Sequence, residues 1–171
     1  IQDDDMRRLA ERVAKLNMEM AVTEEMVRIA REIKPHDCCL VPEKRQELTT
    51  EGGLDVVGRE EIITDATRRL MEVGIQVSLF IDPVPAQLEA AKRTGAECVE
   101  LHTGAFANDV GETELNRLVE AAKVGHELEL VVNAGHGIDY INIQGIKRIP
   151  YLNELNIGHS IVAKAIMIGF E

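Results

Sequence analysis

Short apolar runs alternate with longer segments of helical periodicity along the whole chain. The runs end at glycine, proline or polar turn residues, and apolar residues between them recur at spacings of three and four. This pattern predicts an initial helix followed by six strands, each with a helix after it. The expected strands are 16–21, 37–41, 75–81, 98–102, 128–132 and 152–157. The expected helices are 3–14, 23–33, 59–73, 84–94, 112–124, a short one near 140–147, and 161–170.

Strands that alternate with helices are typical of a parallel sheet, which is either open or closed into a barrel. A closed (β/α)8 barrel has eight strands and about 250 residues. This chain has 171 residues and six expected strands, so the pattern fits an open sheet or a barrel without its first two strands. No linker or low-complexity segment divides the chain. We therefore expect one domain that spans residues 1–171.

The composition favours an aliphatic core, because 45% of the residues are hydrophobic, only 3% are aromatic, and tryptophan is absent. Such cores are typical of parallel sheets covered by helices. The net charge of −11 disfavours nucleic acid and anionic membranes as partners. Cys38, Cys39 and Cys98 lack the spacing of metal ligands, and we interpret them as reduced, buried thiols of a cytoplasmic protein.

Two of the expected strands lead into a Gly-His pair, and an Asn comes before each pair. The run 128–132 leads into Asn133-Ala134-Gly135-His136-Gly137, and the run 152–157 leads into Gly158-His159. Carboxyl ends of neighbouring parallel strands meet at one rim, where α/β proteins bind ligands. His136 is then a candidate proton carrier, and Gly158-His159 a phosphate site at a helix N-terminus. The structural alternatives are a turn histidine bonded to backbone and a simple helix cap.

Glu19 is unusual because it lies between Met18 and Met20 in an apolar strand. A buried carboxylate is costly unless it is paired or functional. Burial would raise its pKa toward neutrality, which suits a general acid or base. The alternative is an ordinary strand residue that is half exposed.

Other ionisable residues give less specific signals. Lys44 and Arg45 are either phosphate or partner contacts or part of a solvated loop. His102 ends a strand and is either a site residue or bonded to a neighbour. His36 and His126 lie near strand entries, and we interpret them as structural. No cluster of His, Cys and Asp has the spacing of metal ligands, so we expect no metal.

Several segments together resemble pyridoxine 5′-phosphate synthase. They include NMEMAVTEEM, CLVPEKRQELTTEGGLDV, QVSLFID and HTG, followed by the segments that carry the two Gly-His pairs. The resemblance implies a (β/α)8 barrel, a homo-octamer and a transferase-class enzyme of vitamin B6 synthesis. The implied reaction condenses 1-deoxy-D-xylulose 5-phosphate with 3-amino-2-oxopropyl phosphate, using no metal or organic cofactor. The alternatives are another barrel enzyme for phosphorylated substrates and a non-catalytic phosphate-binding chain.

The resemblance also implies residue roles. It makes Glu19 and His136 acid–base groups, Thr49 a contact of the deoxyxylulose phosphate, and Gly137, Gly158 and His159 contacts of the amino-oxopropyl phosphate. The family's first two strands, which carry an Asn, an Asp-His pair, an Arg and a further catalytic His, have no counterpart after Ile1. The resemblance therefore implies six βα units of an incomplete barrel. We expect the isolated 171-residue chain to be inactive or nearly so.

Overall fold

Six parallel strands form one curved sheet in the structure, a computed structural model that describes residues 2–43 and 52–170. Their order in the sheet is their order in the chain, β1-β2-β3-β4-β5-β6, as expected for consecutive βα units. The strands are β1 (Asn17–Ala21), β2 (Asp37–Val41), β3 (Gln76–Ile81), β4 (Cys98–His102), β5 (Val131–Gly135) and β6 (Leu152–Asn156).

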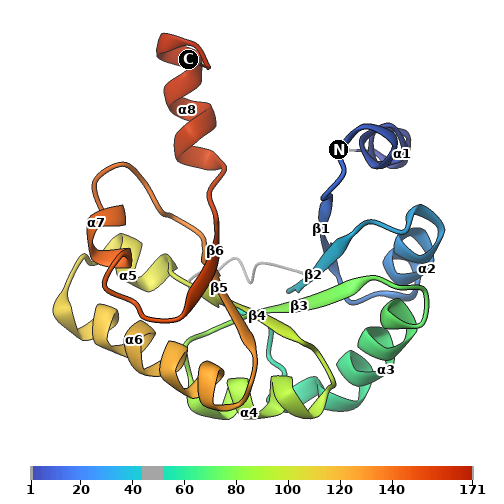
Figure 1. The fold of residues 1–171 in the computed structure, drawn as a ribbon, viewed down its shortest axis with the longest axis horizontal. Helices are drawn as coiled ribbons and strands as arrows, with labels where there is room; N and C mark the ends of the chain where they lie inside the picture. Colours follow the sequence, from blue (N-terminus) through green and yellow to red (C-terminus); the bar gives the residue numbers. More distant parts are fainter. Residues whose placement is uncertain (1, 44–51, 171) are drawn as a thin grey trace.

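Helices cover the convex face of this sheet, and the concave face opens between the first and last helices (Figure 1). The outer layer consists of α2, α3, α4 and α6, whereas α1 and α8 stand on either side of the opening. The helices are α1 (Asp3–Arg12), α2 (Glu24–Ile33), the 3-10 helix η1 (Val57–Arg59), α3 (Glu60–Met71), α4 (Pro85–Arg93), α5 (Gly104–Asn108), α6 (Glu112–Glu127), α7 (Ile143–Ile146) and α8 (His159–Ile168).

The two faces of the sheet differ in polarity because side chains alternate along each strand. Residues that point toward the helices are apolar and buried, among them Leu40, Leu79 and Leu101. Their neighbours in the sequence point to the concave face and are largely polar, as Glu19 and Glu100 illustrate. The hydrophobic core therefore lies between sheet and outer helices, and the concave face is left to form a site.

The sheet curls so far that its two edge strands approach each other. Lys15, just before β1, places its Nζ atom 2.8 Å from a carboxylate oxygen of Glu154 in β6. One lysine side chain thus spans the distance between the edges at that end. The curvature confirms a fold of the (β/α) barrel type with six βα units rather than a flat, doubly wound sheet.

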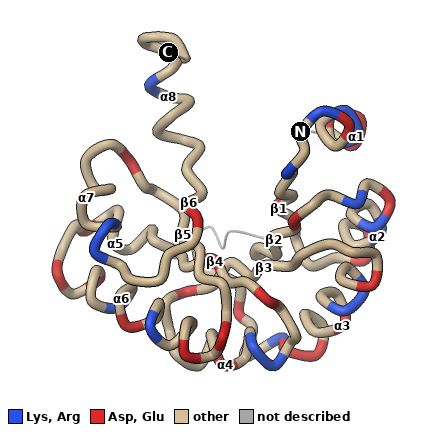
Figure 2. The backbone as a smooth tube through the Cα atoms, viewed as in Figure 1, with Lys and Arg blue, Asp and Glu red and all other residues tan. Residues whose placement is uncertain are grey.

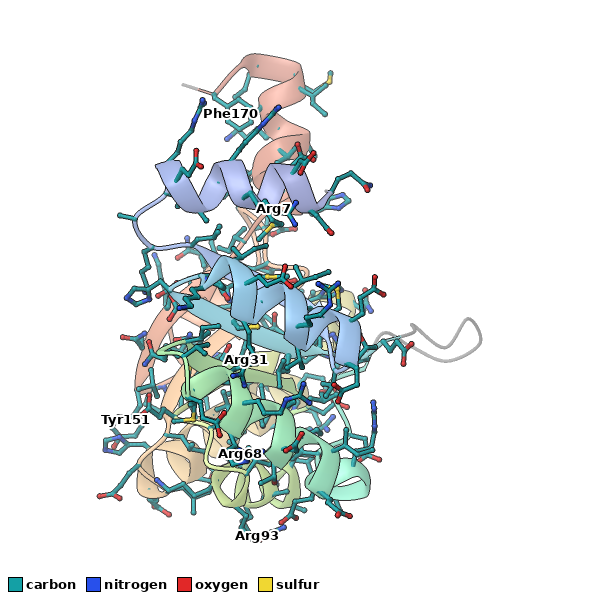
Figure 3. All side chains as sticks on the ribbon, turned by 90° about the vertical axis from the view of Figure 1, so that its right-hand side faces the viewer. Arg7, Arg31, Arg68, Arg93, Tyr151 and Phe170 are labelled. Atoms are coloured by element: carbon teal, nitrogen blue, oxygen red, sulfur yellow. The ribbon has the colours of Figure 1, made fainter. Side chains whose placement is uncertain are left out.

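The outer helices carry most of the charged residues, whereas α8 carries a single lysine (Figure 2). Arg31, Arg68 and Arg93 lie on the successive helices α2, α3 and α4 (Figure 3). Arg93 bridges helices, with its guanidinium 2.8 Å from Glu60 of α3. Such exposed pairs contribute little free energy individually, so the core holds the layers together. No described helix is both long and apolar enough to cross a membrane.

The structure corrects the sequence prediction in two places. The fifth strand is Val131–Gly135 and not 128–132, because α6 continues to Glu127 and a turn with Glu129 at φ 56° follows. A short helix, α5, follows His102, where the expected elements include no helix before 112–124. Its five residues are too few to show helical periodicity, and buried Phe106 anchors it.

Candidate active site

A cavity of about 1400 Å³ opens on the concave face, at the carboxyl ends of the strands. It exceeds the roughly 300–1,000 Å³ typical of a site for one small molecule. Five predicted site residues line it, namely Glu19, His136, Gly137, Gly158 and His159. The predicted Thr49 lies outside the described residues, as do Lys44 and Arg45.

The two Gly-His segments lie side by side, as the sequence predicted. Gly135 at the end of β5 pairs with Asn156 at the end of β6. The hydroxyl of Ser160, in the first turn of α8, donates a hydrogen bond to the carbonyl of Ile138 at 2.8 Å. This bond ties the start of α8 to the segment that follows β5, so both segments face one cavity.

His136 has a left-handed backbone, with φ at +83°. This conformation costs about 1–3 kcal/mol in a residue other than glycine and persists only where the surroundings fix it. Here the hydroxyl of Thr103 lies 2.7 Å from the carbonyl oxygen of Gly135 and 2.5 Å from that of His136. The single hydroxyl proton is shared between the two carbonyls, and the Thr103 backbone N–H also donates to that of Gly135 at 2.9 Å, so Thr103 fixes the backbone from which His136 reaches the cavity.

Glu100, in the middle of β4, is a site residue that the sequence prediction missed. Its side chain is only 3% exposed, although it also borders the cavity. Its Oε2 atom accepts a hydrogen bond from the side-chain amide of Asn156 and lies 3.6 Å from the thiol of Cys39. The pKa of Glu100 is raised to about 7, chiefly by burial and also by the charge of Glu19, against the opposing effect of the Asn156 bond. Such a carboxyl group can both take and give a proton at neutral pH.

Glu19 does not have the buried environment that the sequence suggested. It is exposed to the cavity from β1, an edge strand of the sheet. The alternation of β1 explains this, because Met18 and Met20 face the helices and leave Glu19 on the open side. The glutamate that is buried within an apolar strand is therefore Glu100 and not Glu19. Glu100 in Cys98–His102 carried the same signal, an acidic residue inside an apolar strand.

Positive charge in the cavity is sparse. Arg59 of η1 is the one lysine or arginine that borders it among the described residues, and sequence reasoning had not singled it out. The first N–H groups of α8 add partial positive charge, because the opening turn of a helix leaves them without helical partners. Backbone N–H groups at Gly158 and His159 are therefore available to an anion at this end of the cavity.

The remaining histidines match the roles expected from their positions. His36 pairs with Asp37 at 2.9 Å, at the opposite end of the strands from the cavity. His126 stacks on Tyr151 with ring centroids 3.9 Å apart. His102 borders the cavity and is also bonded to a neighbour, so both alternatives hold for it. Within residues 2–43 and 52–170, no group of His, Cys, Asp and Glu side chains is arranged to hold a metal ion.

A curved sheet of βα units with ionisable side chains and a helix N-terminus at its carboxyl rim defines a protein of the (β/α) barrel class. The family model of the pyridoxal phosphate biosynthesis protein PdxJ matches residues 1–171, and the chain belongs to this family. Similar curated proteins are named pyridoxine 5′-phosphate synthase. That of Coxiella burnetii is 51% identical over 174 residues, which cover 99% of this chain and 72% of the relative. That of Idiomarina loihiensis is 53% identical over 176 residues and 73% of its length.

Solved structures support the fold. The tryptophan synthase A-subunit of Pyrococcus furiosus superposes with a TM-score of 0.66 at 13% identity, over 99% of this chain and 66% of that one. The alpha subunit of Campylobacter jejuni tryptophan synthase gives a TM-score of 0.58 at 16% identity, over 94% of this chain and 64% of that one. At such identities the likeness concerns the arrangement of the chain alone.

Proposed function

We propose that this cavity carries out the ring-closing step of vitamin B6 synthesis. The step condenses 1-deoxy-D-xylulose 5-phosphate with 3-amino-2-oxopropyl phosphate and yields pyridoxine 5′-phosphate, inorganic phosphate and water. The observation that carries the proposal is the family match over residues 1–171, with Glu19, Glu100 and His136 around one cavity. The cavity volume of about 1400 Å³ is large enough for two small substrates together.

The chemistry requires repeated proton transfers. An amine and a ketone first condense to an imine, and losses of water and protons follow before the ring is aromatic. We assign these transfers to Glu100, whose pKa is raised to about 7, and to His136, with Glu19 as a second, solvated carboxylate. Two carboxyl groups in different environments can hold different protonation states at one pH, which permits an acid and a base side by side.

Phosphate groups position the substrates in this proposal. Gly137, Gly158 and His159 bind the phosphate of 3-amino-2-oxopropyl phosphate, where the N-terminus of α8 supplies free N–H groups. Thr49, which lies outside the described residues, contacts 1-deoxy-D-xylulose 5-phosphate in this proposal. Two anchored ends would hold flexible molecules in register, which can lower the barrier by several kcal/mol.

The resemblance extends the proposal beyond the site. We propose a homo-octamer of single-domain chains that acts in the cytoplasm as a transferase-class enzyme and uses no metal or organic cofactor. Sedimentation velocity measures the assembly of the intact protein, by which we mean the chain together with the two N-terminal strands that the resemblance implies. A monomer at micromolar concentration would contradict the octamer without touching the catalytic assignment.

The direct test supplies both substrates to the intact protein and measures pyridoxine 5′-phosphate by mass spectrometry. Substitution His136→Gln should lower the rate by about 10²–10⁴-fold, the usual contribution of a general acid or base. Substitution His126→Phe is the matched control, because it preserves the ring stacked on Tyr151 and lies away from the cavity. Binding of both substrates without product in the unsubstituted protein would contradict the proposal.

A further inference from the structure

Asp82, the residue after β3, joins two neighbouring segments at the cavity. Its Oδ1 atom accepts the backbone N–H of Gly53 at 3.0 Å and lies 3.1 Å from Nδ1 of His102. Asp82 is half-buried, whereas the His102 side chain is only 5% exposed. The bond from His102 is the main reason that the pKa of Asp82 is lowered, so the carboxylate is ionised at neutral pH.

This contact fixes which nitrogen of His102 carries a proton. An ionised carboxylate can only accept hydrogen bonds, so Nδ1 must be the donor. In the neutral ring Nε2 is then the acceptor, and this atom is buried without a hydrogen-bond partner among the described residues. The environment therefore selects one tautomer and one ring orientation.

The fixed His102 ring packs directly against His136. Their ring centroids are 5.1 Å apart with an interplanar angle of 60°, and Phe80 packs on the His102 ring with the centroids 4.9 Å apart. Gly104 makes this approach possible. A Cβ atom there would lie 2.5 Å from Nε2 of His102 and 3.2 Å from Cδ2 of His136.

Backbone and ring of His136 are thus fixed by different partners. The Thr103 hydroxyl lies 2.5 Å from the carbonyl oxygen of His136, and this contact fixes the backbone from which the His136 side chain extends. The His102 ring limits the side-chain rotation that remains. Because the hydrogen bond to Asp82 orients the His102 ring, the Asp82 carboxylate influences the orientation of His136 through His102.

We propose that Asp82 and His102 form a positioning pair that holds the His136 ring in its working orientation. The proposal deepens the proposed function. The role of His136 as a proton carrier rests on that function, whereas the orientation of its ring does not. Neither residue takes part in proton transfer to substrate in this account. Asp82 and His102 contribute by fixing the orientation of the His136 ring.

The decisive measurement is ¹⁵N NMR of the histidine rings in the 171-residue chain, which needs no turnover. His102 should show a protonated Nδ1 and an unprotonated Nε2. Substitution Asp82→Ala should mix its tautomers and shift or broaden the ring signals of His136. Substitution Asp82→Asn keeps an acceptor oxygen at the same place and should restore both signals. The control His36→Gln removes another histidine paired with an aspartate, far from the cavity, and should change neither ring.

Kinetics of the intact protein provide the second readout. Asp82→Ala should lower kcat by about tenfold to a hundredfold with KM changed less than about twofold, because a misplaced catalytic group costs up to about 10² in rate. Asp82→Asn should recover most of the loss, and the surface control Asp65→Ala should have no effect. His136 signals that stay unchanged in Asp82→Ala would overturn the positioning pair. Unaltered activity in His136→Gln would instead overturn the proposed function, so the two failures are distinguishable.

Discussion

The side-chain amide of Asn156 in β6 reaches over β5 to the carboxyl group of Glu100 in β4. In the strand between them Gly135 is the partner of Asn156, whereas Glu100 pairs two residues earlier in that strand, and the missing side chain of Gly135 leaves the path open. A Cβ atom on Gly135 would lie 2.1 Å from Oε1 of Glu100 and 3.1 Å from Cβ of Asn156. A glycine in a central strand therefore has a specific purpose here, which is to let two polar side chains meet across it.

Substitution Gly135→Ala tests this relationship. The new methyl group must displace the Glu100 carboxyl group, so we expect a loss of about 1–3 kcal/mol in the free energy of unfolding, together with a loss of activity. Urea unfolding measures the first and product formation the second. Gly111→Ala is the matched control, since a Cβ atom there meets nothing closer than 3.7 Å. Equal stability of the two variants would show that the crowding at Gly135 is relieved without consequence.

Burial of Glu100 should make the folded protein less stable as the pH rises. The pKa of its side chain is near 4.5 when unfolded and is raised to about 7 by burial in the folded protein. Between these values the folded state binds more protons, so stability falls with rising pH across this window, by about 3 kcal/mol at most. Below pH 4.5 the carboxyl group is protonated in both the folded and the unfolded protein, so this destabilising contribution is absent.

Substitution Glu100→Gln should remove that pH dependence. The variant should match the parent protein near pH 4 and exceed its free energy of unfolding at pH 8, measured by urea unfolding at both values. Glu89→Gln on the exposed face of α4 is the control and should leave the difference between the two pH values unchanged. A Glu100→Gln variant that is less stable than the parent at pH 8 would show that the ionised carboxylate is well solvated.

The strained backbone of His136 separates its catalytic from its structural role. Glycine adopts the observed φ of +83° without strain, so His136→Gly should change the free energy of unfolding by less than about 1 kcal/mol. Activity should fall by about 10²–10⁴-fold, because the proton carrier is gone. Lys34→Gly, at φ 52° on an exposed helix end, is the control for relief of strain without loss of function. Retained activity in His136→Gly would remove the residue from the proton pathway.

The sequence predicted correctly that the site lies at the carboxyl rim, but it did not predict correctly which glutamate is buried. The Gly-His segments were found because glycine and histidine after an apolar run form a local signal, and His136 and His159 do line the cavity. Glu19 and Glu100 gave the same local signal, an acidic residue within an apolar strand, yet one is exposed and the other buried. The difference depends on position in the sheet, since β1 is an edge strand and β4 a central one.

The sequence by itself determined the alternation of strands and helices, the aliphatic core, and the rim on which the site lies. These follow from side-chain periodicity and from turn residues, which act over a few neighbours in the chain. The tertiary structure decided which carboxyl group is buried, how Asn156 reaches Glu100 past Gly135, and that Asp82 and His102 pack toward His136. These contacts join residues 20 to 56 positions apart, and curvature of the sheet brings them together, which no local pattern records.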